Sequence, residues 1–326
     1  MKLAIVLISL CVVLFTVSLV TGRAPVTAGQ SLAALFSNDG TPLTIVMREI
    51  RLPRALLAVM IGASLGLAGA AMQGYLRNPL AEPGLIGVSG SAALGAVLAL
   101  QTGLATTFAL ALPLAALTAA LASVGLILLL AGPRGSSLTL ILAGIAISAL
   151  AAALTSLVLN LSPNPFAAAE IVFWMLGSLS DRSFDHVWIA LPFMLAGWVM
   201  LASMGRGLDA LTLGEDAAAA LGIHLTQLRL LLVVGTAASV GAATAVAGAI
   251  GFVGLVVPHV LRRFVGARPS ALLWSSALGG AAMVLAADIA VRLILPERDL
   301  KLGVLMALVG APLFLHLIYK TRSEIR

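Results

Sequence analysis

The chain has 326 residues, of which 61% are hydrophobic and only 10% are charged, and its formal net charge is +6. Ordinary soluble domains carry roughly 25% charged residues, and a soluble protein of this size cannot bury so much apolar surface. The composition therefore excludes a soluble globular protein and predicts an integral membrane protein. The excess of Lys and Arg is typical of anchored membrane loops and does not indicate nucleic-acid binding.

The apolar segments are continuous and rich in small residues, with 32 glycines in the chain. Small residues let helix backbones approach closely in lipid, whereas a transmembrane barrel requires alternating segments of about ten residues. The sequence therefore predicts an all-α bundle in which each span needs about 20 apolar residues. We expect about ten spans, at residues 3–20, 53–73, 84–101, 106–130, 138–160, 187–204, 228–250, 254–267, 271–293 and 303–319.

The first range resembles a signal peptide because Lys2 precedes an apolar stretch. The stretch is long for the apolar region of a signal peptide, and no clear small-residue cleavage site follows it. We therefore expect a retained first helix. The single cysteine, Cys11, lies within this helix and cannot form a disulfide within the chain.

The second range is preceded by "MREIRLPR" (47–54), which places three arginines at the start of a span. Lys and Arg concentrate in cytoplasmic loops, and this bias favours cytoplasmic N- and C-termini for ten spans. The three arginines then lie on the outer face, against the bias. Interfacial anchoring could explain any one of them, whereas all three together favour a docking surface for an acidic partner.

The stretch "QGYLRNPLAEPGLIGVSGSAALG" (73–95) follows the second span. Pro79 and Pro83 bracket a predicted non-helical connection, and Gly84 and Gly87 permit tight backbone turns. Broken backbone at membrane depth is tolerated only where it is buried in protein or lines a cavity. The residues leave two interpretations open, a gate or pathway element and an ordinary cytoplasmic loop.

A shift of 179 residues along the sequence aligns the second span with the seventh. The matching pairs are Gly62 with Gly241, 68–70 with 247–249, and Pro79 with Pro258. The two spans are five apart, so they cross the membrane in opposite directions. This predicts an inverted repeat within a single polytopic domain (1–326), with copies at about 50–160 and 228–319.

The stretch "LDALTLGEDAAAALGIHLTQLR" (208–229) lies between the sixth and seventh spans, on the predicted cytoplasmic side. Glu215 and Asp216 favour the start of a short helix, and Gly222 suits its end. The segment is too short and too acidic to span a membrane. It is either a contact for a cytoplasmic partner or a solvated loop.

Asp288 precedes Arg292 by four residues, which predicts an ion pair on one helix face. No buried chain of acids or histidines emerges that could relay protons or hold sodium, and the histidines have no metal-ligand spacing. P-loop and HExxH motifs are missing from the sequence. We therefore expect no catalytic residue, no metal and no cofactor, and any ATP hydrolysis requires another chain.

Four stretches together resemble the permease subunits of binding-protein-dependent ABC importers for iron–siderophores, haem and cobalamin, the FecCD-type family. They extend from about residue 50 to 318 in the family's order. They read "IRLPRALLAVMIGASLGLAGAAMQGYLRNPLAEPGLIGVSGSAALG", "TLGEDAAAALGI", "AVAGAIGFVGLVVPHVLRRFVG" and "LAADIAVRLILPERDLKLGVLMALVGAPLFLHLI".

The resemblance implies a type II ABC importer permease that works as a homodimer in the lipid of a bacterial inner membrane. Its implied partners are two cytoplasmic ATPase subunits and a periplasmic or lipid-anchored substrate-binding protein. The implied cargo is an iron–siderophore, haem or cobalamin. The fifth and tenth spans would line most of a pathway at the dimer axis.

The resemblance also implies roles for particular residues. Docking of the binding protein falls to Arg51, Arg54 and Arg292. The ATPase-coupling loop, 208–224, includes Leu213, Gly214, Glu215, Asp216, Ala217, Leu221 and Gly222. Hinge or packing roles fall to Asn78, Pro79, Pro83, Gly84, Gly87 and Pro258.

Two other functions remain open at this point. A secondary transporter with inverted repeats would need only this chain and an ion gradient, although the lack of a buried chain of acids or histidines counts against it. A membrane scaffold would have no transport role at all.

Overall fold

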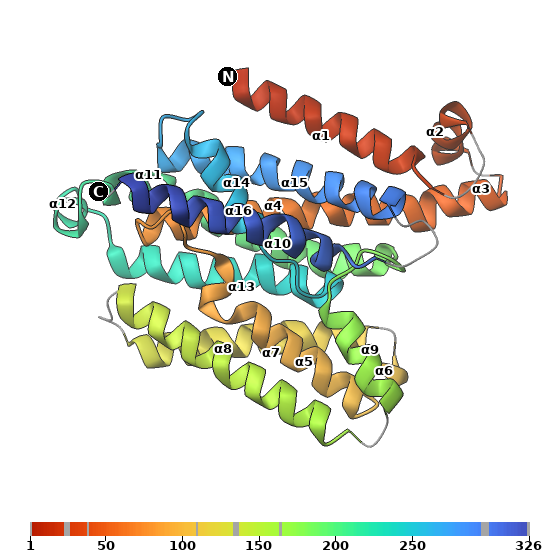
Figure 1. Ribbon diagram of the computed structural model, residues 1–326, viewed down its shortest axis with the longest axis horizontal. Coiled ribbons are helices and arrows are strands. Elements are labelled where there is room, and N and C mark those ends of the chain that lie inside the picture. The colour runs from red at the N-terminus through yellow and green to blue at the C-terminus, as the bar shows by residue number, and fades with distance from the viewer. Residues whose placement is uncertain are drawn as a thin grey trace.

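The computed structural model describes residues 2–22, 27–37, 39–108, 110–132, 137–162, 165–294 and 300–324. Within these ranges the chain folds into helices and connections and contains no β-strand (Figure 1). The predicted all-α class is therefore confirmed.

Within the described ranges, ten helices correspond to the ten predicted spans. Seven are long and apolar enough to cross a membrane: α1 (Lys2–Val20), α4 (Leu52–Tyr75), α7 (Ala111–Ala131), α8 (Ser137–Asn160), α10 (Phe184–Ser203), α13 (Leu225–Ala247) and α15 (Pro269–Ile294). Three have shorter apolar segments: α5 (Val88–Gln101), α14 (Val253–Arg262) and α16 (Leu302–Glu324).

Short helices connect these ten. They are α2 (Ala28–Phe36), α3 (Pro42–Ile45), η1 (Val46–Arg51), η2 (Pro83–Ile86), α6 (Leu104–Thr107), α9 (Pro165–Met175), α11 (Gly205–Leu211) and α12 (Glu215–Ala220). α3, η1 and α4 form one continuous helix of 34 residues, Pro42–Tyr75, in which η1 is a π-helical turn. The helix therefore begins before the predicted range 53–73 and contains all three arginines of "MREIRLPR", of which Arg48 and Arg51 were expected to precede the span.

The α4 and α15 helices pack backbone to backbone at the centre of the bundle. A Cβ atom on Gly62 would lie 2.2 Å from the carbonyl oxygen of Gly280, and one on Gly66 would lie 1.9 Å from that of Ser276. Only residues without a side chain permit this approach, which maximises van der Waals contact between helices in lipid. The predicted tight helical packing is therefore realised by these glycines.

Helices α4 and α13 run antiparallel. The C-terminal end of α4 lies at α11, where a Cβ on Gly74 would be 3.3 Å from the side chain of Leu208. The N-terminal end of α13 lies there too, because a Cβ on Gly207 would be 2.7 Å from Leu228. The opposite directions are those that the predicted inverted repeat requires.

The bundle has two chemically different ends. We call the end that carries α11 and α12 the α12 end, and the end with Arg51, Arg54 and Arg292 the arginine end. Figure 1 places the C-terminal end of α16 at the α12 end. α1 finishes at the arginine end, so its N-terminus points toward the α12 end (Figure 1).

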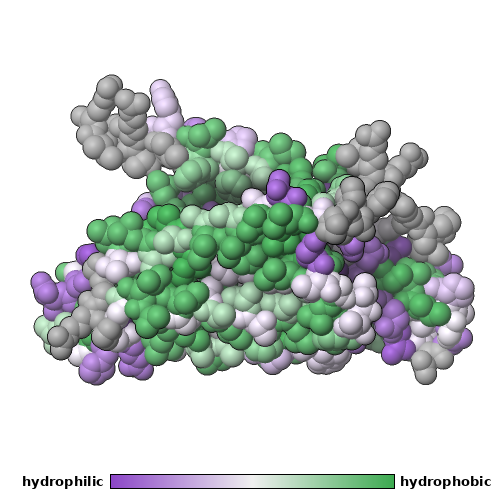
Figure 2. Space-filling model, turned by 90° about the horizontal axis from the view of Figure 1, so that it is seen from below, coloured by the Kyte–Doolittle hydropathy of each residue, from purple (hydrophilic) through white to green (hydrophobic). Residues whose placement is uncertain are grey.

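Apolar side chains cover the outside of the bundle between its ends. On the face seen in Figure 2, hydrophobic residues occupy the middle and hydrophilic residues gather toward both ends. The spans differ strongly in burial. In the most apolar 18-residue stretch of α1, 17% of the residues are buried, against 83% in the corresponding stretch of the helix that contains α4. α1 therefore lies at the periphery, and α4 lies in the core.

Candidate functional site

At the arginine end, Asp288 binds two arginines. Nε and Nη2 of Arg54 lie 2.9 and 2.8 Å from Oδ1 of Asp288, and Nη2 of Arg292 lies 2.9 Å from Oδ2. The carboxylate is fully buried, while the side chains of Arg54 and Arg292 are 17% and 13% exposed. The predicted pair of Asp288 and Arg292 is confirmed. Sequence reasoning missed Arg54 as the second partner.

Arg51 and Arg292 also hold the C-terminal end of α1. Nη1 of Arg51 donates to the carbonyls of Leu19 and Val20, at 2.9 and 3.2 Å. Nη1 of Arg292 donates to those of Ser18 and Thr21, both at 2.9 Å. The last carbonyls of a helix lack intrahelical partners, and cations there match the helix dipole. We call these contacts the α1 clamp.

The three predicted docking residues therefore also have partners inside the chain. Arg51 is only 5% exposed, so its guanidinium serves the α1 clamp first. Arg54 and Arg292 share one carboxylate, which leaves the group of three arginines and Asp288 with net positive charge. The arginine end keeps a basic character, and a partner could reach only the exposed edges of Arg54 and Arg292.

At the α12 end, the predicted short helix is present as α12. Glu215 and Asp216 form its first turn, and Gly222, with φ +84°, follows its last residues. The seven predicted coupling residues are all exposed or half-buried, and Leu213 and Leu221 are 69% and 64% exposed. Two exposed leucines beside two carboxylates give this segment a mixed apolar and acidic surface.

Two residues that attach this segment were missed by sequence reasoning. Ala218 is fully buried and fixes one face of α12 against the bundle. Asp209 in α11 accepts hydrogen bonds from the backbone N–H and hydroxyl of Ser270, at 2.9 and 2.7 Å, and from Nε of Arg268 at 3.0 Å. We call this group the Asp209 joint.

The Asp209 joint favours the ionised carboxylate. Partial burial alone would raise the pKa of Asp209, but the hydrogen bonds from Ser270 and from Arg268, together with the charge of Arg268, lower it below its ordinary value. Because Arg268 is 71% exposed, the bonds to Ser270 contribute more than the ion pair.

The segment after α4 packs against α14. Oε1 of Glu82 accepts a hydrogen bond from the backbone N–H of Phe252 at 2.9 Å. A Cβ on Gly254 would lie 2.7 Å from Cδ of Pro83, so the segment touches the first turn of α14. Phe252 itself has φ +67°, an uncommon conformation for a bulky residue.

The remaining predicted hinge and packing residues differ in their environments. Oδ1 of Asn78 accepts from the backbone N–H of Leu80 at 2.9 Å, and Gly87 has φ +77°. Pro258 lies inside α14 and is buried, Pro79 is half-buried and Gly84 is exposed. These contacts pack the segment against α14, and its role as a gate, hinge or packing element stays a prediction.

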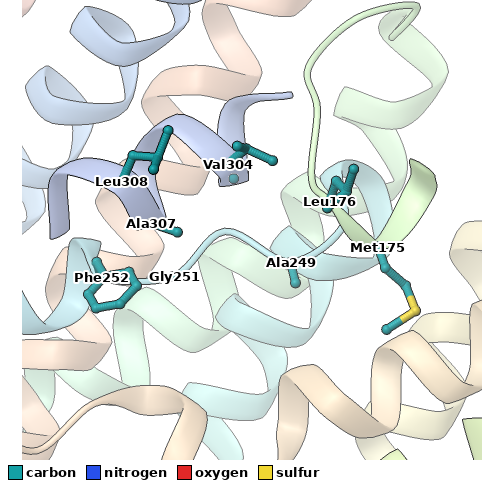
Figure 3. A pocket seen from close by; sticks show the side chains of 9 residues that line it. Met175, Leu176, Ala249, Gly251, Phe252, Val304, Ala307 and Leu308 are labelled. Carbon is teal, nitrogen blue, oxygen red and sulfur yellow. The ribbon is translucent and has the colours of Figure 1, made fainter. Parts of the chain in front are cut away.

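A cavity of about 450 Å³ lies between the end of α9, the connection before α14 and the start of α16 (Figure 3). Its lining residues are Met175, Leu176, Ala249, Gly251, Phe252, Gly303, Val304, Ala307 and Leu308. None of these residues carries a charge. The tenth predicted span, now α16, contributes four of them, whereas the fifth, now α8, contributes none.

Within the ranges that the structure describes, no three His, Cys, Asp or Glu side chains are placed to share a metal ion.

Comparisons with known proteins match most of the chain. The model of the FecCD transport family matches residues 10–320. The ABC transporter permease protein YvrB of Bacillus subtilis is 38% identical over 290 residues, which cover 87% of this chain and 82% of YvrB. The vitamin B12 import system permease protein BtuC of Klebsiella pneumoniae is 36% identical over 316 residues, which cover 97% and 92%.

Solved structures give the same result. A transporter described as of the metal-chelate ABC type, in an inward-facing conformation, superimposes with a TM-score of 0.86 and 34% identity, covering 98% of this chain and 99% of that one. PsaBC of Streptococcus pneumoniae, at 16% identity and a TM-score of 0.54, shares the fold alone. The sequence match covers nearly the full length and the structural match covers the same architecture, so this chain belongs to the FecCD transport family of ABC importer permeases.

Proposed function

We propose that this chain forms the membrane pathway of an ATP-driven importer for an iron–siderophore or a related metal complex such as haem or cobalamin. The observation that carries the proposal is the family match over residues 10–320. The names of two relatives, a vitamin B12 permease and a metal-chelate transporter, support this class of bulky metal-containing cargo.

The working assembly is a homodimer with two ATPase subunits in the cytoplasm and a binding protein outside. The α12 end faces the cytoplasm, together with both termini. Its exposed Leu213 and Leu221, beside Glu215 and Asp216, support contact with an ATPase surface that offers an apolar groove with basic residues at its rim.

The arginine end faces the binding protein. Complementary charge speeds encounter and fixes register, so the net positive charge of Arg54, Arg292 and Arg51 supports docking of acidic side chains. Arg54 and Arg292 contact the partner through their exposed edges. Arg51 contributes charge and keeps the end of α1 in place.

The cavity between α9, α14 and α16 is assigned to the pathway, and it suits a cargo that arrives already enclosed by its carrier. Its lining contains no charged side chain, so this region of the permease provides no strong polar site to retain a cargo. High affinity then resides in the binding protein, and the permease supplies passage. The segment 78–87, packed against α14, serves as the hinge or packing element beside the cavity.

The test is uptake into proteoliposomes that contain the permease, its cognate ATPase and its cognate binding protein. Labelled cyanocobalamin, haem and a ferric siderophore are compared, with and without internal nucleotide. We expect uptake of one of them to require ATP and the binding protein. Uptake driven by an ion gradient through this chain alone would favour the secondary transporter, and failure of all probes in a complex without ATPase association would favour the scaffold.

A further inference from the structure

The coupling segment is attached to the membrane helices at two places. On one side α12 continues through Gly222 and Ile223 into α13. On the other side it continues back into α11, whose Leu208 and Leu211 are buried. The Asp209 joint adds polar contacts between α11 and the bundle.

The Asp209 joint caps α15 from another helix. The first N–H groups of a helix have no intrahelical acceptor, and that of Ser270 lies in the first turn of α15, directly after Pro269. Caps normally come from the residue just before the helix. Here the carboxylate comes from 61 residues away, so the bond that completes α15 also ties α11 to it.

Helix α15 extends from this joint to the opposite end of the molecule. Its 26 residues span about 39 Å at 1.5 Å per residue, and its last turns carry Asp288 and Arg292. The backbone contact between Gly62 and Gly280 joins it to α4, whose first turn carries Arg54. Because backbone meets backbone at this contact, we treat the two helices as one packed unit with the Asp209 joint at one end and the arginines at the other.

We propose that Asp209 is a positioning residue that makes the coupling segment and α15 move together. A change at the ATPase contact on α12 then alters the arginine end, and docking at the arginine end alters α12. This inference rests on the proposed function, since it assigns a route between the ATPase contact and the docking face. Linkage between two sites is reciprocal, so docking of the binding protein changes ATP hydrolysis through the same joint.

The experiment compares Asp209→Ala, Asp209→Asn and Ser270→Ala with the wild type in the complete complex, reconstituted in vesicles of phosphatidylethanolamine and phosphatidylglycerol. ATP hydrolysis is measured with and without the cognate binding protein. Asp185→Asn is the matched control, because Asp185 is exposed at the start of α10. Co-purification of the ATPase and the unfolding temperature are measured for each variant.

We expect Asp209→Ala to lower the ratio of binding-protein-stimulated to basal ATP hydrolysis about threefold or more in complexes that retain the ATPase. Asp209→Asn keeps an acceptor for the N–H of Ser270 and should lie between Ala and the wild type. Ser270→Ala removes the hydroxyl bond alone and should show a smaller loss in the same direction.

Wild-type stimulation in a folded Asp209→Ala complex would overturn the inference. A second result would also overturn it: Asp209→Ala loses ATPase association or folding, while Asp209→Asn and Ser270→Ala show normal stimulation. The joint would then serve only to fold the coupling segment and would not link it to the docking face. If the wild-type complex itself shows no ATP-dependent response to the binding protein, the proposed function fails and the inference fails with it.

Discussion

Removal of the Asp288 carboxylate should destabilise the chain strongly. Asp288→Ala deletes the group that accepts from both Arg54 and Arg292, and it leaves two guanidinium groups that are only 17% and 13% exposed. Breaking a buried ion pair by removing one partner costs about 3–5 kcal/mol, since the remaining charge stays desolvated. We expect a loss of about 3 kcal/mol, near the lower limit, because both arginines retain some contact with water and Arg292 keeps its bonds to α1.

The assay is reversible unfolding in detergent micelles, with Arg54→Ala and the double variant completing a thermodynamic cycle. Arg54→Ala should cost less than Asp288→Ala, because Arg292 still balances the carboxylate. The two substitutions should be clearly non-additive, since their side chains are in contact. A loss below about 1 kcal/mol for Asp288→Ala, or additive losses, would refute the argument that this carboxylate is what makes the burial of the arginines tolerable.

Three further predictions concern other regions. Gly280→Val should prevent the close packing of α4 and α15, because its Cβ would lie 2.0 Å from the carbonyl oxygen of Gly62. Gly125→Ala, with open space around it, is the control and should be neutral or stabilising by about 0.5–1 kcal/mol. Unfolding and yield in detergent are measured for both variants. Glu215→Arg should weaken ATPase association, measured by co-purification at low salt, and equal recovery at every salt concentration would contradict a basic rim on the ATPase. Because the pKa of Asp209 is lowered in the folded state, its joint stabilises the fold fully above the unfolded pKa of about 3.9 and loses this effect as pH falls through the folded pKa. The difference in unfolding free energy between the wild type and Asp209→Asn should therefore be constant between about pH 5 and 8 and shrink below about pH 4.

Much of the fold was readable because a bilayer imposes a length on each apolar run. The expected range 228–250 became α13 (Leu225–Ala247), and 271–293 became α15 (Pro269–Ile294). The start of the second span was not readable. The expected range 53–73 left Arg48 and Arg51 before the span, whereas partners on α1 and α15 let Arg51 and Arg54 lie within one continuous helix.

The candidate site was readable only where its chemistry is local. The pair of Asp288 and Arg292 follows from helical spacing, and α12 follows from its acidic start and glycine end. The bond between Arg54 and Asp288 joins residues 234 positions apart, and that between Asp209 and Ser270 joins residues 61 apart. A single sequence carries no signal for such pairs, because any arginine in the chain could serve as partner to any aspartate.

The α1 clamp has a consequence for biosynthesis. Arg292 follows Ser18 by 274 residues, so its half of the clamp cannot close until most of the chain has been made. At about 5–20 residues per second, α1 waits roughly 14–55 s for this partner. During that time its own affinity for lipid and the Arg51 half of the clamp keep it in place. Among the seven long apolar helices in the described ranges, α1 has the highest mean hydropathy, which suits a helix that waits for its last partner in lipid.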